Sequence, residues 1–157
     1  MTGERENNLP MRNLKRDISW QPYRALSRYP HMSPEDTQVW NSFIKSYPDY
    51  FDRCAYDLRV GRGTEPSPSL SPEYQKMVTD LSQKRIDVVA MKRQYVTIIE
   101  VKKYAALSAC GQILVYRYLF RSDFPDYINP HMLIVYNQLD PDIVDFCAAH
   151  HILLARV

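Results

Sequence analysis

The chain has 157 residues, a length that favours one domain with a hydrophobic core of its own. Hydrophobic residues make up 45% and charged residues 24%, as in ordinary soluble domains, and a net charge of +2 permits a nucleic-acid partner without requiring one. The apolar runs are too short to cross a bilayer, and the first residues lack the apolar stretch of a secretory signal. Three widely spaced cysteines fit a reducing compartment. We therefore expect a cytoplasmic protein that does not enter membranes.

Residues 1–30 are polar and carry six basic against three acidic side chains. They are predicted as an arm that precedes a single domain over residues 31–157. Because chain termini are commonly untethered, one interpretation is a mobile or loosely docked arm. The other is an arm that docks on nucleic acid, on a partner protein or on a second copy of the chain, with Trp20 and Tyr23 as anchors.

The first elements of the domain are predicted from capping residues and periodicity. A helix is expected over residues 33–46, where Ser33 caps the N-terminus and Pro34 suits the first turn. Residues 54–60 alternate enough to form a strand. The Pro- and Ser-rich segment that follows predicts an exposed loop, and a short helix is predicted over residues 72–81.

The second half of the chain is predicted to alternate strands and helices. The strands are expected over residues 85–91, 95–103, 131–136 and 152–157, and the helices over residues 105–121 and 140–149. The first of these helices is expected to bury one broad face made of Leu107, Cys110, Gly111, Leu114, Val115, Tyr118 and Leu119. We predict an α/β fold in which helices flank a central mixed β-sheet, with the element order α-β-β-β-α-β-α-β.

Three ionisable residues lie inside two otherwise apolar strands: Asp87, Glu100 and Lys102. Charges in such surroundings are costly unless they are paired or bound to something. A turn of two or four residues between the strands places Asp87 opposite Glu100, with Lys102 on the same side of the sheet. A three-residue turn would place Asp87 opposite Ile99 instead.

The sequence at this turn does not favour its shortest form. Arg93 and Gln94 would be the two central residues, and Arg-Gln is not a preferred pair in a two-residue hairpin loop. We therefore expect the four-residue turn, which keeps the same register between the two strands.

Two facing carboxylates repel each other, and a divalent cation would remove the conflict. Mg²⁺ takes oxygen ligands and commonly uses one or two carboxylates together with a substrate phosphate. Lys102 would then help to orient or deprotonate a water molecule, or stabilise charge on the phosphate. The alternative is an ordinary cross-strand salt bridge on a wet face of the sheet. The apolar neighbours on both faces argue against that alternative.

The order of these residues resembles the signature of the PD-(D/E)XK nuclease superfamily, which has the restriction-endonuclease-like fold. The signature places one acid on a strand, then an acid, any residue and a lysine on the next, matched here by Asp87 and by Glu100, Val101 and Lys102. The predicted order of elements from about residue 33 to residue 136 also matches the core of that fold. The proline that precedes the first acid in the family is Ile86 here.

A second match lies on the helix after the lysine. Gln112 and Tyr116 resemble the Q-x-x-x-Y element of the RecB-like branch, and their spacing puts them on one helix face. That branch often adds an acid or a histidine from the first helix, for which Glu35 is the candidate, with His31 behind it. Asp57 on the first strand is another candidate. The alternative for Glu35 is an acid that stabilises the helix N-terminus.

The resemblance implies a deoxyribonuclease that hydrolyses DNA phosphodiester bonds with Mg²⁺ or Mn²⁺. Asp87, Glu100 and the Val101 carbonyl would hold the metal, with Glu35 as a further ligand, and Lys102 would assist the reaction. Gln112 and Tyr116 would position the DNA strand. The candidate contacts to the DNA backbone, chosen by charge and predicted proximity, are Arg59, Arg62, Lys84, Lys103 and Arg117.

The sequence leaves two further interpretations of the protein's function open. One is a catalytically inactive nuclease-like fold that binds DNA or serves in assembly, for example in a phage or mobile element, in the virion or the host cytoplasm. The retained acids and lysine argue for the enzyme. The other is a zinc site at Cys147, His150 and His151, which lacks a second cluster of ligands nearby in the sequence. No phosphate-binding loop, Rossmann glycine pattern or G-x-S-x-G motif is present.

Overall fold

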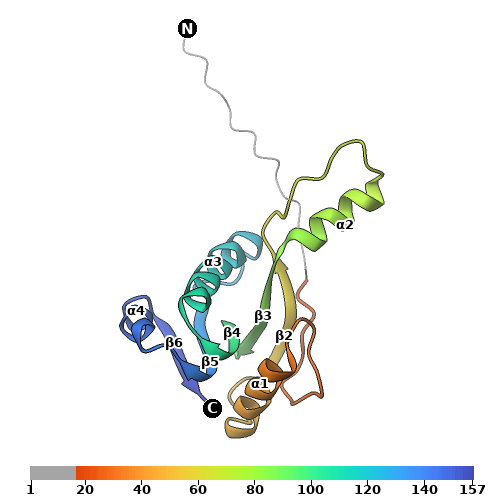
Figure 1. The fold of residues 1–157 in the computed structure, drawn as a ribbon. Coiled ribbons are helices and arrows are strands. Elements are labelled where there is room, and N and C mark those ends of the chain that lie inside the picture. The colour runs from red at the N-terminus through yellow and green to blue at the C-terminus, as the bar shows by residue number, and fades with distance from the viewer. Residues whose placement is uncertain (1–16) are drawn as a thin grey trace.

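The computed structural model describes residues 17–157, which form one open, mixed β-sheet with helices on both of its faces (Figure 1). In the sheet the strands follow their order in the chain: β1 (Gln21–Pro22), β2 (Arg53–Val60), β3 (Lys84–Lys92), β4 (Tyr95–Ala105), β5 (His131–Leu139) and β6 (Ile152–Arg156). Pairing is antiparallel from β1 to β4 and parallel from β4 to β6. The predicted α/β class and mixed sheet are confirmed.

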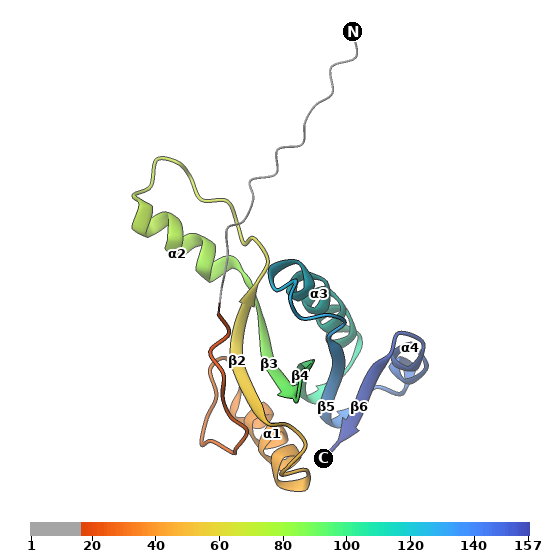
Figure 2. The ribbon, with the colours of Figure 1, turned by 180° about the vertical axis from the view of Figure 1, so that it is seen from behind.

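The helices are α1 (Pro34–Ser46), α2 (Pro72–Ser82), α3 (Leu107–Asp123), the 3₁₀ turn η1 (Pro141–Ile143) and α4 (Val144–Ala149). The Ser33 hydroxyl caps α1 by accepting a hydrogen bond from the Asp36 amide at 3.0 Å, as the sequence predicts. Apolar residues of α1 pack on one face of the sheet, and those of α3 and α4 pack on the other (Figure 2). Within residues 17–157 no helix is both long and apolar enough to cross a membrane.

The face that α3 buries differs from the predicted one. Its buried residues are Ala109, Cys110, Ile113, Tyr116 and Phe120. Leu107 and Tyr118, which were expected to be buried, are 73% and 75% exposed. The reason is that α3 carries apolar residues around most of its circumference, so periodicity alone does not select the buried face.

The turn between β3 and β4 has two residues, so the expected four-residue turn is wrong. Lys92 pairs directly with Tyr95 across it. Arg93 adopts a positive φ of 54°, which an arginine rarely does. The Asp52 carboxylate compensates by accepting a hydrogen bond from the Arg93 amide at 2.6 Å and by pairing with Lys92 at 3.1 Å. Both turn lengths give the same register, so the predicted alignment of the two strands is confirmed where they pair.

The β3 and β4 strands part in the middle of the sheet. Their pairing runs from the turn as far as Val88 and Ile99. Beyond that point β3 continues beside β2 to Lys84, whereas β4 continues beside β5 to Ala105. The residues at the fork therefore have backbone groups that no longer meet across the two strands.

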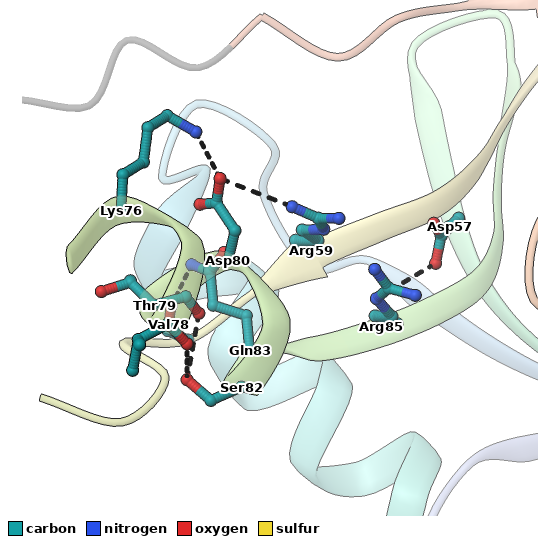
Figure 3. A network of polar contacts seen from close by, with 10 residues as sticks. Asp57, Arg59, Lys76, Val78, Thr79, Asp80, Ser82, Gln83 and Arg85 are labelled. Carbon is teal, nitrogen blue, oxygen red and sulfur yellow. Dashed lines mark hydrogen bonds and ion pairs between the residues drawn. The ribbon is translucent and has the colours of Figure 1, made fainter. Parts of the chain in front are cut away.

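The α2 helix confirms the short helix predicted over residues 72–81, which the predicted element order left out, and it is an insertion between β2 and β3. None of its residues is buried, and it projects away from the sheet (Figures 1 and 2). Its C-terminal end is tied to the sheet by Asp80, which pairs with Arg59 at 3.6 Å and also with Lys76 (Figure 3). The Gln83 side chain donates a further hydrogen bond to the Gly61 carbonyl at 2.7 Å.

The part of the predicted arm that the structure describes, residues 17–30, lies against the domain. β1 pairs with β2, and Tyr29 is buried. The two expected anchors contact this same chain: Arg53 lies 5.1 Å from the Trp20 ring, and the Tyr23 hydroxyl donates to the Tyr47 carbonyl at 2.8 Å. Residues 1–16 of the predicted arm lie outside the described residues.

Candidate active site

Asp87 and Glu100 lie at the fork between β3 and β4. The next step of the register beyond Val88 and Ile99 would set these two acids opposite each other. Asp87 accepts a hydrogen bond at 3.0 Å from the amide of Val101, which lies beyond the last backbone pair of β3 and β4. Lys102 Nζ lies 2.9 Å from Glu100 Oε1. The structure thus brings together the three ionisable residues that the sequence singled out.

The two carboxyl groups sit in surroundings that oppose their ionisation. Glu100 is 1% exposed, and its burial, with the Asp87 charge as a second cause, raises its pKa to about 8. Burial also raises the pKa of Asp87, against the hydrogen bond from Val101 and the charge of Lys102. For Lys102, burial lowers the pKa, but the charge of Glu100, its hydrogen bond and the charges of Asp87 and Asp36 together outweigh burial, so the net shift is upward.

The α3 helix brings Tyr116 to the same site. Burial, with the charges of Glu100 and Asp87 as further causes, raises the pKa of Tyr116 to about 12, so its hydroxyl lies within the field of the two carboxylates. A hydrogen bond with Gln112 acts in the opposite direction. The two residues of the Q-x-x-x-Y pattern therefore interact with each other, and the charges of the two carboxylates reach Tyr116.

The acid that α1 contributes is Asp36 and not Glu35. The charge of Asp36 raises the pKa of both Asp87 and Glu100, and its carboxylate accepts a hydrogen bond from the Lys103 amide at 2.8 Å. Glu35 is 61% exposed at its side chain and pairs with Lys103 Nζ at 2.7 Å. The structure does not bring Glu35 to the pair of acids. Sequence reasoning missed Asp36 because an acid in the first helical turn has a sufficient structural explanation.

A further acid, Asp57, lies on β2 beside Asp87 of β3. It lies between the pairs Tyr56–Val88 and Leu58–Ile86, so it is level with Asp87, and its charge raises the pKa of Asp87. Its φ of 54° is strained for an aspartate within a strand. Arg85 Nε lies 3.6 Å from its carboxylate (Figure 3), and His31 Nε2 lies 3.8 Å from it.

The donor set fits a hard divalent cation that keeps open positions for water and substrate. The Glu100 Oε2 atom is buried and has no hydrogen-bond partner. An orphaned carboxylate oxygen beside a second carboxylate is the arrangement that a cation would satisfy. Within residues 17–157 no three His, Cys, Asp or Glu side chains form a ready-made metal site, so Asp87 and Glu100 with the Val101 carbonyl would supply only part of the coordination.

The proposed zinc site at Cys147, His150 and His151 does not form. Cys147 is buried, with its Sγ 3.7 Å from that of Cys110, while both histidines are exposed. His150 instead stacks on Phe146.

The five candidate contacts to a DNA backbone have different surroundings. Arg59 pairs with Asp80, Lys103 pairs with Glu35, and Arg117 Nε donates to the Pro130 carbonyl at 2.8 Å. Arg62 and Lys84 are exposed, and neither makes an ion pair with a residue that the structure describes.

Comparisons with protein-family models, with curated proteins and with solved structures give no match to this chain.

Proposed function

We propose that this protein is a metal-dependent nuclease that hydrolyses phosphodiester bonds in DNA, built on the restriction-endonuclease-like core. The single observation that carries the proposal is the buried pair of acids at the fork, in which one Glu100 oxygen meets Lys102 and the other has no partner. A sheet does not need this arrangement for stability, because burying unpaired carboxyl groups costs free energy. The succession α1, β2, β3, β4, α3, β5 agrees with the helix and strand order of that core.

The residues of the site have distinct roles in this proposal. Asp87, Glu100 and the Val101 carbonyl hold Mg²⁺ or Mn²⁺, which when bound supplies a Lewis acid at the phosphate. Lys102 stabilises negative charge that builds on the phosphate or orients the attacking water. Tyr116, held by Gln112, positions the strand beside the carboxylates.

Asp36 and Asp57 act as positioning residues. Asp36 fixes the β4 backbone after Lys102 through its hydrogen bond from the Lys103 amide. Asp57 is level with Asp87 and holds Arg85 next to it. Neither needs to touch the metal for these roles.

The proposal is tested by incubating the protein with supercoiled plasmid and with single-stranded circular DNA in the presence of Mg²⁺ or Mn²⁺. The wild type is expected to cleave at least one substrate. Glu100→Gln and Lys102→Met are each expected to reduce the rate by about a hundredfold or more, because the first removes a carboxylate that would hold the metal and the second removes the positive charge beside the phosphate.

Matched controls separate this result from a general effect of removing a charge. Glu73→Gln removes an exposed glutamate from the first turn of α2, and Lys92→Met removes an exposed lysine at the hairpin. Both are expected to cleave at the wild-type rate. A wild type as inert as Glu100→Gln on both substrates, with either metal, would rule out the nuclease and favour the inactive DNA-binding or assembly protein.

A further inference from the structure

A cleft of about 550 Å³ lies where β2 ends and β3 begins. One wall is the segment of residues 60–64 that leaves β2, together with Ser82 and Lys84 at the end of α2 and the start of β3. The other wall is the C-terminal part of α3, including Tyr118 and Leu119. Pockets of this size hold small organic ligands or a nucleotide.

The first wall of the cleft is held in place by close contacts. Gly61 and Gly63 both have positive φ values, 83° and 69°. A Cβ at Gly63 would lie 2.6 Å from the Thr79 carbonyl oxygen, so only glycine allows this approach to α2. The Asp123 carboxylate accepts a hydrogen bond from the Gly61 amide at 2.8 Å. The cleft is therefore formed before any ligand binds.

The charge of the cleft favours an anion. Arg62 and Lys84 line it, and they are the two basic candidates that have no ion pair among the described residues. Among the described lining residues the only acid is Asp123, and its carboxylate holds the Gly61 amide. Two cations without an ion pair, against one carboxylate, leave the described lining with a net positive charge that suits the phosphates of a nucleic-acid backbone.

The lining of the cleft also includes an aromatic ring. Tyr118 lines it and is 75% exposed. An exposed ring beside backbone-binding cations is the combination on which proteins stack the bases of single strands. In a duplex the base faces are already covered by their neighbours, so this ring has no partner there.

Two elements, β3 and α3, contribute residues both to the proposed active site and to the cleft. Lys84 precedes Asp87 by three residues on β3, a distance of about 10 Å along a strand. Tyr118 follows Tyr116 by two residues on α3, an axial rise of about 3 Å. Both elements therefore run from the proposed active site to the cleft, and the step from Tyr116 to Tyr118 also turns from the buried to the exposed face of α3.

We propose that this cleft binds the unpaired nucleotides that flank the scissile phosphate, so that the substrate is single-stranded DNA or the single-stranded end of a duplex. Arg62 and Lys84 contact phosphates, and Tyr118 stacks on a base. The assignment of the substrate rests on the proposed nuclease function. The binding site itself does not, because it can be measured without metal and without cleavage.

The test measures affinity by fluorescence anisotropy in EDTA, with a labelled oligothymidylate of about twelve nucleotides and with a duplex of the same length. Tyr118→Ala is expected to weaken binding of the single strand about tenfold, whereas Tyr118→Phe keeps the ring and the affinity. Lys84→Ala is expected to weaken binding and to lower the slope of log affinity against log salt by about 0.7, the value for one phosphate of a single strand.

The matched controls are Tyr95→Ala, an exposed tyrosine at the hairpin, and Lys45→Ala, a lysine in the last turn of α1. Both are expected to bind the single strand as the wild type does. Unchanged affinity in Tyr118→Ala would overturn the site, and an equal loss on the duplex would overturn the preference for single strands. A protein that binds through the cleft but never cleaves would contradict the nuclease and support the site.

Discussion

Glu100 is the residue on which the proposed site depends, and its burial costs free energy. Its carboxyl group is buried, and one of its oxygens has no hydrogen-bond partner. Lys102 offsets part of the cost through its contact with the other oxygen. The remaining cost appears as a pKa of about 8, well above the ordinary value of 4.5.

This shift predicts that the metal-free protein becomes less stable as the pH rises. Between pH 4.5 and about 8 the carboxyl group is ionised in the unfolded chain but protonated in the folded one, so unfolding releases a proton. The free energy of unfolding should fall by up to about 1.4 kcal/mol per pH unit over this window and level off above it. Urea unfolding in EDTA between pH 5 and pH 9 measures the slope.

Glu100→Gln is the matched variant for this measurement. It keeps the shape of the side chain but does not titrate, so only the smaller contribution of Asp87, whose pKa is also raised, should remain in its slope. Parallel curves for the wild type and Glu100→Gln would contradict the raised pKa of Glu100.

Much of the site could be predicted from residue types, because few reasons exist for Asp87, Glu100 and Lys102 to interrupt apolar strands. Asp36 could not be predicted in this way. It follows Glu35 directly, and both acids suit the first turn of a helix. Which of them turns toward the sheet is decided by the Lys103 amide, whose position depends on the packing of α1 against β4.

At the scale of elements, the hairpin between β3 and β4 has a turn that its local sequence does not predict. Arg93 and Gln94 form a two-residue turn that their own preferences disfavour. Asp52, which precedes β2, holds the Arg93 amide, and this contact crosses 41 positions of the chain. The buried face of α3 was likewise mispredicted, because apolar residues on several sides of one helix leave the choice to the rest of the fold.

The glycines of α3 and of the segment before α2 should respond in opposite directions to alanine. Gly111 lies within α3 with no atom near its would-be Cβ, so Gly111→Ala should raise the free energy of unfolding by up to about 1 kcal/mol through helix propensity. Gly63→Ala should lower it by about 1 kcal/mol or more, because of the positive φ and the clash with Thr79. Urea unfolding of both variants measures the difference.

The opposite signs are the decisive part of that comparison. A stabilising Gly63→Ala would mean that the segment before α2 does not approach α2 as described. Since Gly63 also lines the cleft, its alanine variant should in addition bind the oligothymidylate more weakly than Gly111→Ala does.

At the scale of the whole molecule, α1 packs on one face of a single sheet, and α3 and α4 pack on the other. The proposed site lies on two strands of this sheet. The order of these elements followed from hydrophobic periodicity and capping residues. The separation of β3 and β4 could not be predicted in this way. It depends on which neighbouring strand each of them pairs with, and local sequence patterns do not determine that pairing.

A site built into the sheet should couple metal binding to the stability of the domain. Mg²⁺ or Mn²⁺ that binds the folded chain stabilises it by mass action, by about 2.7 kcal/mol at a concentration one hundred times the Kd. The Tm of the wild type should therefore rise with metal concentration, as followed by thermal unfolding. Glu100→Gln should show little rise, and Glu73→Gln should behave as the wild type does. An equal rise in all three proteins would place the metal elsewhere.

The hydrogen bond at the fork gives the site a natural spectroscopic reporter. The Val101 amide donates to the Asp87 carboxylate and not to a backbone carbonyl. Its ¹⁵N resonance is therefore sensitive to the ionisation and ligation of Asp87, and the rate at which it exchanges with solvent would report how often the two strands separate at that point. The Val101 amide can thus report both the protonation state of the candidate site and the local opening of the sheet.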